Sequence, residues 1–343
     1  MKKFASIASA LVLAVLLTAC GGNDQAKDCK TTGIVVTDIG GVDDKSFNQS
    51  AHEGLLKFAE DNKDKGACAA KSIQSSTDAD LVPNLSTASS GSNQLVVAAG
   101  YKFKDPITEV AKKYPDQKYL IIDDFVDHKN VASAVFAANE GSFLAGVASA
   151  TKAKEAGKNT IGFIGGGDSP IIAAFAAGYK QGAEAAYPGI KVKIQYTGDF
   201  ADASKAKTMA TQMYNDGTYI IYQAAGNAGN GVISAAKELV KDQGKDVWVV
   251  GVDKDQYDEG KYDGDKSVIL TSMVKNIYVP VSETMQSILD GGFKGGRLDY
   301  NLKNDGVGLP KENPNLDEKT LKKVEEFKQK IIKGEIKVNE KIK

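Results

Sequence analysis

From Gly33 onward, the sequence alternates short segments rich in valine and isoleucine with longer amphipathic segments. Runs of β-branched residues are typical of buried parallel strands, and apolar residues three and four positions apart are typical of helices. This alternation predicts an α/β fold with parallel sheets. The predicted strands cover residues 33–37, 70–74, 94–98, 118–122, 131–136, 159–164, 191–196, 219–223, 246–251 and 267–273. The predicted helices include residues 105–114, 140–153, 170–187, 203–215 and 230–242.

The alternating pattern forms two blocks, one before about Ala137 and one after it. A chain of 343 residues is also too long for one typical hydrophobic core. We therefore expect two doubly wound parallel-sheet lobes that are joined by hinge strands. The first lobe is predicted to contain residues 31–136 and about 274–295, and the second residues 137–273 and about 296–343.

The first 20 residues have the pattern of an export signal. Lys2 and Lys3 precede an apolar run that ends at Leu17 and is too short to span a bilayer. The residues directly before Cys20 are similar to a bacterial lipobox, in which the cysteine becomes the acylated first residue of the mature protein. We therefore expect a lipoprotein signal peptide over 1–20, a lipid on Cys20, and a flexible polar tether over 21–30. The expected location is the extracytoplasmic face of the cell membrane, and plain secretion is the alternative.

Two further cysteines precede the first two predicted strands. Cys29 precedes the strand at 33–37, and Cys68 precedes the strand at 70–74. Neighbouring parallel strands have adjacent amino ends, and exported proteins can form disulfides. We predict a disulfide between Cys29 and Cys68, with two unpaired thiols as the alternative.

The segment from Thr37 to Gln49 joins the first predicted strand to a helix. Asp38 comes at the carboxyl end of that strand, and the sequence from Ser46 to Gln49 matches a capping box that would begin the helix near Phe47. Open α/β sheets bind ligands at the carboxyl ends of their strands. Clustered carboxylates followed by an aromatic residue and the amide of Asn48 therefore predict a ligand site at this junction.

This segment resembles the pocket loop of the Bmp/PnrA family, the nucleoside-binding lipoproteins of ABC importers, and the resemblance extends from Gly33 to about Gly308. It implies a type I periplasmic-binding fold, a nucleoside ligand with purines favoured, and an ABC permease as partner. It implies capture of the ligand, with no enzymatic step and no cofactor. We expect a monomer in which Asp38 and Asn48 contact the edge of the base.

Phe200 occupies the position in the second block that Phe47 occupies in the first. It follows the strand predicted at 191–196 and precedes the helix predicted at 203–215. Two aromatic rings from two lobes could stack on both faces of a flat heterocycle, and the resemblance assigns this role to the same pair. The alternative is that both phenyl rings belong to the hydrophobic core.

Other polar residues follow further predicted strands and suit a ribose. Carboxylates accept hydrogen bonds from vicinal hydroxyl groups, and a lysine can donate to the sugar while it offsets the charge of a neighbouring acid. For each acid alone, a helix N-cap is the alternative role, and either Asp123 or Asp124 could point inward. The candidate residues are Asp123, Asp124, Gly226, Asp253 and Lys275.

Composition argues against several other classes of protein. The chain has 43 basic and 44 acidic residues with no basic patch, so we expect no nucleic-acid partner. Arg297 is the only arginine, which argues against a receptor for amino acids or phosphate esters. His52 and His128 are the only histidines, and neither has a second ligand at a metal-like spacing. The glycines between 162 and 167 lack the spacing of a dinucleotide fingerprint and predict a tight turn.

An enzymatic alternative comes from the same loop. Its aspartates are similar to the motif with which nucleoside hydrolases bind the calcium ion that activates water. Val36 stands where the first aspartate of that motif belongs, so one oxygen ligand is missing. A calcium-dependent nucleoside hydrolase is therefore the less favoured function. A ligand-sensing lipoprotein that signals to a membrane receptor would have the same sequence features.

Overall fold

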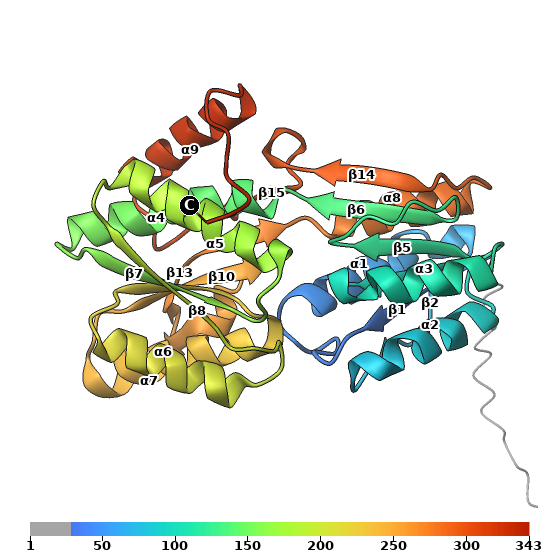
Figure 1. The fold of residues 1–343 in the computed structure, drawn as a ribbon, viewed down its shortest axis with the longest axis horizontal. Helices are drawn as coiled ribbons and strands as arrows, with labels where there is room; N and C mark the ends of the chain where they lie inside the picture. Colours follow the sequence, from blue (N-terminus) through green and yellow to red (C-terminus); the bar gives the residue numbers. More distant parts are fainter. Residues whose placement is uncertain (1–28, 343) are drawn as a thin grey trace, which may run out of the picture.

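The computed structural model describes residues 29–342, which fold into two lobes (Figure 1). The predicted signal peptide, Cys20 and most of the tether lie outside the described residues. The first lobe contains a sheet of strand order β14-β6-β5-β4-β1-β2, in which β3 also pairs with β1 and all pairs are parallel. Its strands are β1 (Thr31–Thr37), β2 (Ala67–Ala69), β3 (Ile73–Gln74), β4 (Leu95–Ala99), β5 (Lys118–Ile122), β6 (Val131–Phe136) and β14 (Gly296–Tyr300).

The second lobe contains a sheet of strand order β15-β13-β10-β9-β7-β8, and β15 runs antiparallel to β13. The strands are β7 (Thr160–Gly165), β8 (Lys191–Tyr196), β9 (Ile220–Ala224), β10 (Trp248–Asp253), β13 (Ile269–Lys275) and β15 (Val307–Gly308). A small hairpin, β11 (Lys261–Asp263) and β12 (Lys266–Ser267), lies beside it. The predicted α/β class with two parallel-sheet lobes is confirmed.

Helices cover the faces of both sheets (Figure 1). Those of the first lobe are α1 (Phe47–Asp61), α2 (Leu81–Ser90), α3 (Lys104–Lys113) and α8 (Tyr278–Leu289). Those of the second lobe are α4 (Ala138–Glu155), α5 (Pro170–Ala186), α6 (Ala203–Asn215), α7 (Gly229–Gln243) and α9 (Glu318–Ile332). No helix among residues 29–342 is both long enough and apolar enough to cross a membrane.

The strand β14 belongs to the first sheet. The expectation that residues from about 296 onward belong to the second lobe was therefore wrong. Gly296 pairs with Ala132 and Tyr300 with Phe136, so β14 forms the edge of the sheet beside β6. The chain therefore crosses between the lobes after β6, after β13 and after β14. An edge strand buries little of its surface, and Gly296–Tyr300 is half exposed and carries two charges, so it lacks the apolar run of a buried strand.

The amino ends of β1 and β2 are tied together by a disulfide between Cys29 and Cys68. The two strands pair in register with Thr32 opposite Cys68, which brings the preceding Cys29 within reach. The structure thus contains the bond that the order of the strands predicts. It anchors the start of the described chain to the outer edge of the first sheet.

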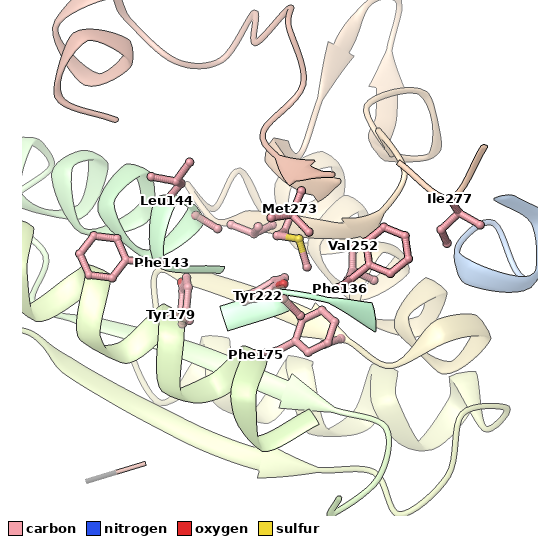
Figure 2. Packing of buried hydrophobic residues seen from close by; sticks show 14 of the residues in the cluster. Phe136, Phe143, Leu144, Phe175, Tyr179, Tyr222, Val252, Met273 and Ile277 are labelled. Atoms are coloured by element: carbon pink, nitrogen blue, oxygen red, sulfur yellow. The ribbon is translucent and has the colours of Figure 1, made fainter. Parts of the chain in front are cut away.

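The core of the second lobe extends to the junction between the lobes. Figure 2 shows Phe143 of α4, Tyr179 and Phe175 of α5 and Tyr222 of β9 in one layer, with Phe136 of β6 at its end. The two helices approach closely because both contribute glycines. A Cβ atom on Gly146 of α4 would lie only 2.1 Å from the carbonyl oxygen of Tyr179.

Candidate ligand-binding site between the lobes

A cavity lies between the lobes at the carboxyl ends of the strands, where open α/β sheets bind ligands. Its empty space is about 610 Å³, including open solvent at the mouth, which suits a small organic molecule. Eight of the nine predicted ligand residues line it, namely Asp38, Phe47, Asn48, Asp123, Phe200, Gly226, Asp253 and Lys275. Further lining residues are Gly40, Asp44, Ala99, Gly100, Tyr101, Lys102, Ile171, Ile172, Phe175, Ala224, Asn227 and Val252.

Asp44 caps the first turn of α1. Its carboxylate accepts hydrogen bonds from the backbone N–H groups of Ser46, Asn48 and Gln49 at 2.9, 2.9 and 3.0 Å. The predicted capping box is therefore wrong, because the Ser46 side chain makes no cap hydrogen bond, although α1 does begin at Phe47. Burial raises the pKa of Asp44 above its ordinary value, and the three N–H groups oppose that shift.

Asp38 and Asn48 form a polar pair in the wall of the cavity. The Asn48 side-chain amide donates to Asp38 Oδ1 at 2.9 Å, and the backbone N–H of Gly40 donates to the same oxygen at 3.0 Å. The buried Asn48 Oδ1 has no hydrogen-bond partner among the residues that the structure describes. The pair therefore presents an amide oxygen beside a carboxylate, and both accept hydrogen bonds from N–H groups.

Lys275 is the buried centre of a charged cluster and only 3% exposed. Its ammonium group is paired with Asp123 and lies 3.9 Å from Asp253 Oδ1. Three phenyl rings surround the same nitrogen, with centroids at 4.7 Å for Phe175, 5.1 Å for Phe47 and 5.7 Å for Phe136. A buried cation requires such partners, because leaving it unpaired costs several kcal/mol.

Asp123 and Asp253 both have left-handed backbones, with φ of +73° and +67°. This region is uncommon for residues other than glycine and stores strain of about 1–3 kcal/mol each. Asp123 directly follows β5, Asp253 is the last residue of β10, and both carboxylates approach Lys275. The left-handed turn thus bends each acid out of its strand and into the cavity.

Asp253 also bonds across the lobes. Its Oδ2 accepts a hydrogen bond from the Ser46 hydroxyl at 2.7 Å. Burial raises the pKa of Asp253 to about 6, while Lys275 and the Ser46 hydrogen bond oppose the shift. This carboxyl group therefore titrates close to neutral pH.

Asp124 does not line the cavity, so the choice between Asp123 and Asp124 falls on Asp123. Asp124 forms an ion pair with Lys104 at 2.8 Å and accepts the N–H of Phe125. The left-handed backbone of Asp123 turns its carboxylate into the cavity, while Asp124 stays with Lys104.

Phe200 enters the cavity from the second lobe and is fixed by its own loop. Its carbonyl accepts the N–H of Ala228 at 3.0 Å. Its ring lies against Gly166, where a Cβ atom would come within 2.3 Å of the ring. The glycine-rich turn after β7 therefore provides space for this phenyl group. From the first lobe, Tyr101 meets the ring edge-on, with centroids 6.3 Å apart.

A family model described as ABC transporter substrate-binding protein PnrA-like matches residues 31–341. The chain belongs to this family. It is 42% identical to the CD4+ T-cell-stimulating antigen of Listeria innocua, with 99% of each chain covered. It is 40% identical to the ABC transporter nucleoside-binding protein BmpA of Lactococcus lactis, covering 98% of this chain and 99% of that one. A solved solute-binding protein of an ABC transporter system from Aeropyrum pernix is 29% identical, with a TM-score of 0.79 over 90% of this chain and 92% of that one.

The acids of the PnrA-like loop are held in separate interactions. Asp44 caps α1, Asp38 bonds to Gly40 and Asn48, and Asp43 is exposed. Among residues 29–342, no group of three histidine, cysteine or acidic side chains could hold a metal ion.

Several lining residues of this substrate-binding protein were not predicted. Tyr101 and Lys102 follow β4, and the rule that ligands meet strand ends could have found them. Ile171, Ile172 and Phe175 come from the start of α5, where apolar residues at helical spacing predict only a core face. Lys102 is a second cation in the cavity and pairs with Asp78 at 2.9 Å.

Proposed function

We propose that this protein captures nucleosides, purines above all, in the cavity between its lobes and delivers them to an ABC permease. The observation that carries the proposal is that Phe47 and Phe200 line one cavity from opposite lobes, beside two distinct polar sets. Aromatic rings favour flat heterocycles, and the polar sets suit a base edge and a sugar. The printed name of the Lactococcus lactis relative supports the same ligand class.

The base would lie between Phe47 and Phe200. Stacking on an aromatic ring contributes about 1–3 kcal/mol per base, and a purine offers more stacked area than a pyrimidine. Asp38 and the free oxygen of Asn48 would accept N–H groups from the edge of the base. Gly226, with φ of +54°, would let the backbone approach the ligand closely.

The ribose would contact the charged cluster. Asp123 and Asp253 can accept hydrogen bonds from hydroxyl groups, and Lys275 can donate one. Both lobes then hold the ligand, so binding favours the closed arrangement over an open one. Capture without a chemical step fits the substrate-binding family, and the permease would accept the closed form.

A titration panel tests this function. Calorimetry at low salt should show binding of inosine, guanosine or adenosine, and weaker binding of the free bases and of ribose. The corresponding 5′-monophosphates should bind at least about a hundredfold more weakly, because like charges in a desolvated site cost several kcal/mol. The cavity gathers four carboxylates, from Asp38, Asp44, Asp123 and Asp253, against two lysines.

Two outcomes would contradict the proposal. Failure of every nucleoside to bind would refute the function itself. Equal affinity for inosine and its monophosphate would refute the assignment of the acidic cluster, and with it the roles given to Asp253 and Lys275.

The membrane anchor needs its own test. We propose that Cys20 is acylated and tethers the protein to the extracytoplasmic face of the membrane. Cys20→Ser should move the protein from the membrane fraction to the soluble fraction. A variant that still sediments with membranes, in cells lacking the permease, would refute the anchor.

A further inference from the structure

Three residues of the second lobe bind one short loop of the first. Asn230 donates to the carbonyl oxygen of Asp44 at 3.0 Å, and Gln256 donates to that of Lys45 at 2.8 Å. The Ser46 hydroxyl donates to Asp253 at 2.7 Å. We call this set the clasp, and its members are Asp44, Lys45, Ser46, Asn230, Asp253 and Gln256.

The first-lobe side of the clasp is rigid. The Asp44 carboxylate binds three backbone N–H groups of the same turn, which fixes the chain from Asp44 to Gln49. Lys45 has a left-handed backbone, with φ of +59°. Such a conformation persists only where its surroundings determine it, and here the bonds of the Asp44 carboxylate to Ser46, Asn48 and Gln49 span Lys45.

The second-lobe side is equally well fixed at Gln256, which is fully buried. Its N–H donates to Ser272 at 3.1 Å. Its side-chain oxygen accepts from the Val252 N–H at 3.0 Å and from the Gln223 amide at 2.7 Å. The remaining amide hydrogens are therefore aimed at Lys45 by bonds within the second lobe. Two preorganised surfaces lose little conformational entropy when they meet.

We propose that the clasp holds a fraction of the molecules closed before any ligand binds and so raises the affinity of the cavity. Asn230 and Gln256 do not line the cavity and act as positioning residues. By holding the loop, they keep Phe47 and Asn48 against the second lobe. An apparent dissociation constant equals the intrinsic constant divided by the fraction of competent molecules, so loosening the clasp weakens binding. This proposal rests on the proposed function in one respect only, namely the choice of a nucleoside as the ligand with which affinity is measured.

Asn230→Ala is the most direct test, because Asn230 is half-buried and its side chain bonds, within the described part of the chain, only to Asp44 and Asn227. Spin labels on Lys112→Cys and Asp216→Cys, exposed residues of different lobes, report the distance between the lobes. Both variants are made with Cys20→Ser, so that the spin label reacts only with the two introduced cysteines, because Cys29 and Cys68 form a disulfide. Ser234→Ala, one helical turn along α7, is the matched control, since Ser234 has no hydrogen bond to the loop.

Without ligand, the fraction of molecules with a short distance between the two spin labels, which are the closed molecules, should be smaller in Asn230→Ala than in the wild type. It should be smaller still in Gln256→Ala. Inosine should bind each variant roughly three- to tenfold more weakly through faster dissociation, as expected for one lost hydrogen bond. Saturating inosine should restore the wild-type distances, and Ser234→Ala should match the wild type throughout. Thermal unfolding of Asn230→Ala should change little.

Wild-type protein with no short-distance population before ligand is added would overturn the proposal. Unchanged distances and affinity in Asn230→Ala would also overturn it, whether or not Gln256→Ala folds. If wild-type protein binds none of inosine, guanosine and adenosine, the proposed function fails, but the distances measured without ligand still decide whether the clasp exists.

Discussion

The two loops that carry Phe47 and Phe200 lie at equivalent strand-to-helix junctions, but they are fixed in different ways. The Phe47 loop is capped by Asp44 and bonds to the second lobe at three points. The Phe200 loop is held within its own lobe by Asp199, whose carboxylate accepts the N–H groups of Ala201 and Asp202, both at 2.7 Å.

This difference indicates how the two rings depend on closure. The Phe47 loop makes hydrogen bonds to the second lobe, whereas the contact of the Phe200 ring with the first lobe is the edge-on packing of Tyr101. Mutations in the first loop should therefore affect closure and binding together. Mutations in the second loop should affect binding alone.

The largest effect should come from Asp44→Ala. The change leaves three backbone N–H groups without their acceptor and should lower the free energy of unfolding by about 2–4 kcal/mol. Inosine affinity should fall at least tenfold. Asp43→Ala is the matched control, because Asp43 is adjacent to Asp44 but exposed. It should leave the free energy of unfolding and the inosine affinity unchanged. If the two variants gave the same results in denaturant unfolding and in calorimetry, the role assigned to the Asp44 cap would be wrong.

Removing either ring should weaken nucleoside binding by about 1–3 kcal/mol, or roughly fivefold to more than a hundredfold. Phe47→Ala should also change the distance between the lobes, because its ring contacts Lys275 as well as the cavity. Phe200→Ala should leave that distance unchanged. If Phe200→Ala binds normally and unfolds at a much lower temperature, the ring belongs to the core and the stacking pair is wrong.

Gly166→Ala should disturb Phe200 without touching the first lobe. The new methyl group would lie 2.3 Å from the phenyl ring, so the ring must move. We expect about a tenfold loss of affinity, smaller than or equal to that of Phe200→Ala. At Gly167 the methyl group would lie 3.3 Å from the ring, so Gly167→Ala should change affinity by less than about threefold. A larger loss at Gly167 would contradict the role assigned to Gly166.

The smallest effect should be a pH dependence that links the two lobes. Asp253, with a pKa of about 6, would accept ligand hydroxyls more strongly when ionised, so affinity should fall by up to about twofold from pH 7.5 to pH 6. Ser46→Ala removes a hydrogen bond that favours the ionised form, so the midpoint should move to higher pH. An unchanged midpoint in calorimetric titrations would show that Ser46 does not influence Asp253.

The free energy of unfolding should depend on the protonation of Asp253 in the opposite direction from the affinity, because protonation of this group favours the folded state. The folded protein holds a proton on Asp253 up to about pH 6, whereas the unfolded chain releases it near 3.8. The contribution of this group is therefore greatest below pH 4 and is lost as the pH rises through 6. Asp253→Asn should flatten that part of the unfolding curve.

The sequence by itself determined the α/β class, the disulfide and the places where ligands could bind. Each follows from local information, namely the alternation of strands and helices and the rule that parallel strands end at one edge. Eight of the nine predicted ligand residues line the cavity for this reason. The resemblance supplied the rest, since composition alone does not distinguish a nucleoside from a sugar.

Only the tertiary structure decided which side chains face one another. Asp123 turns inward because its backbone is left-handed, whereas Asp124 pairs with Lys104 outside the cavity. Ser46 matches a helix cap in sequence, yet its hydroxyl bonds to Asp253 across the lobes. The predicted capping box was wrong because the actual partner of Ser46 lies 207 residues away in the sequence. Local patterns record the preferences of neighbouring residues, and contacts between distant segments depend on how the two lobes pack.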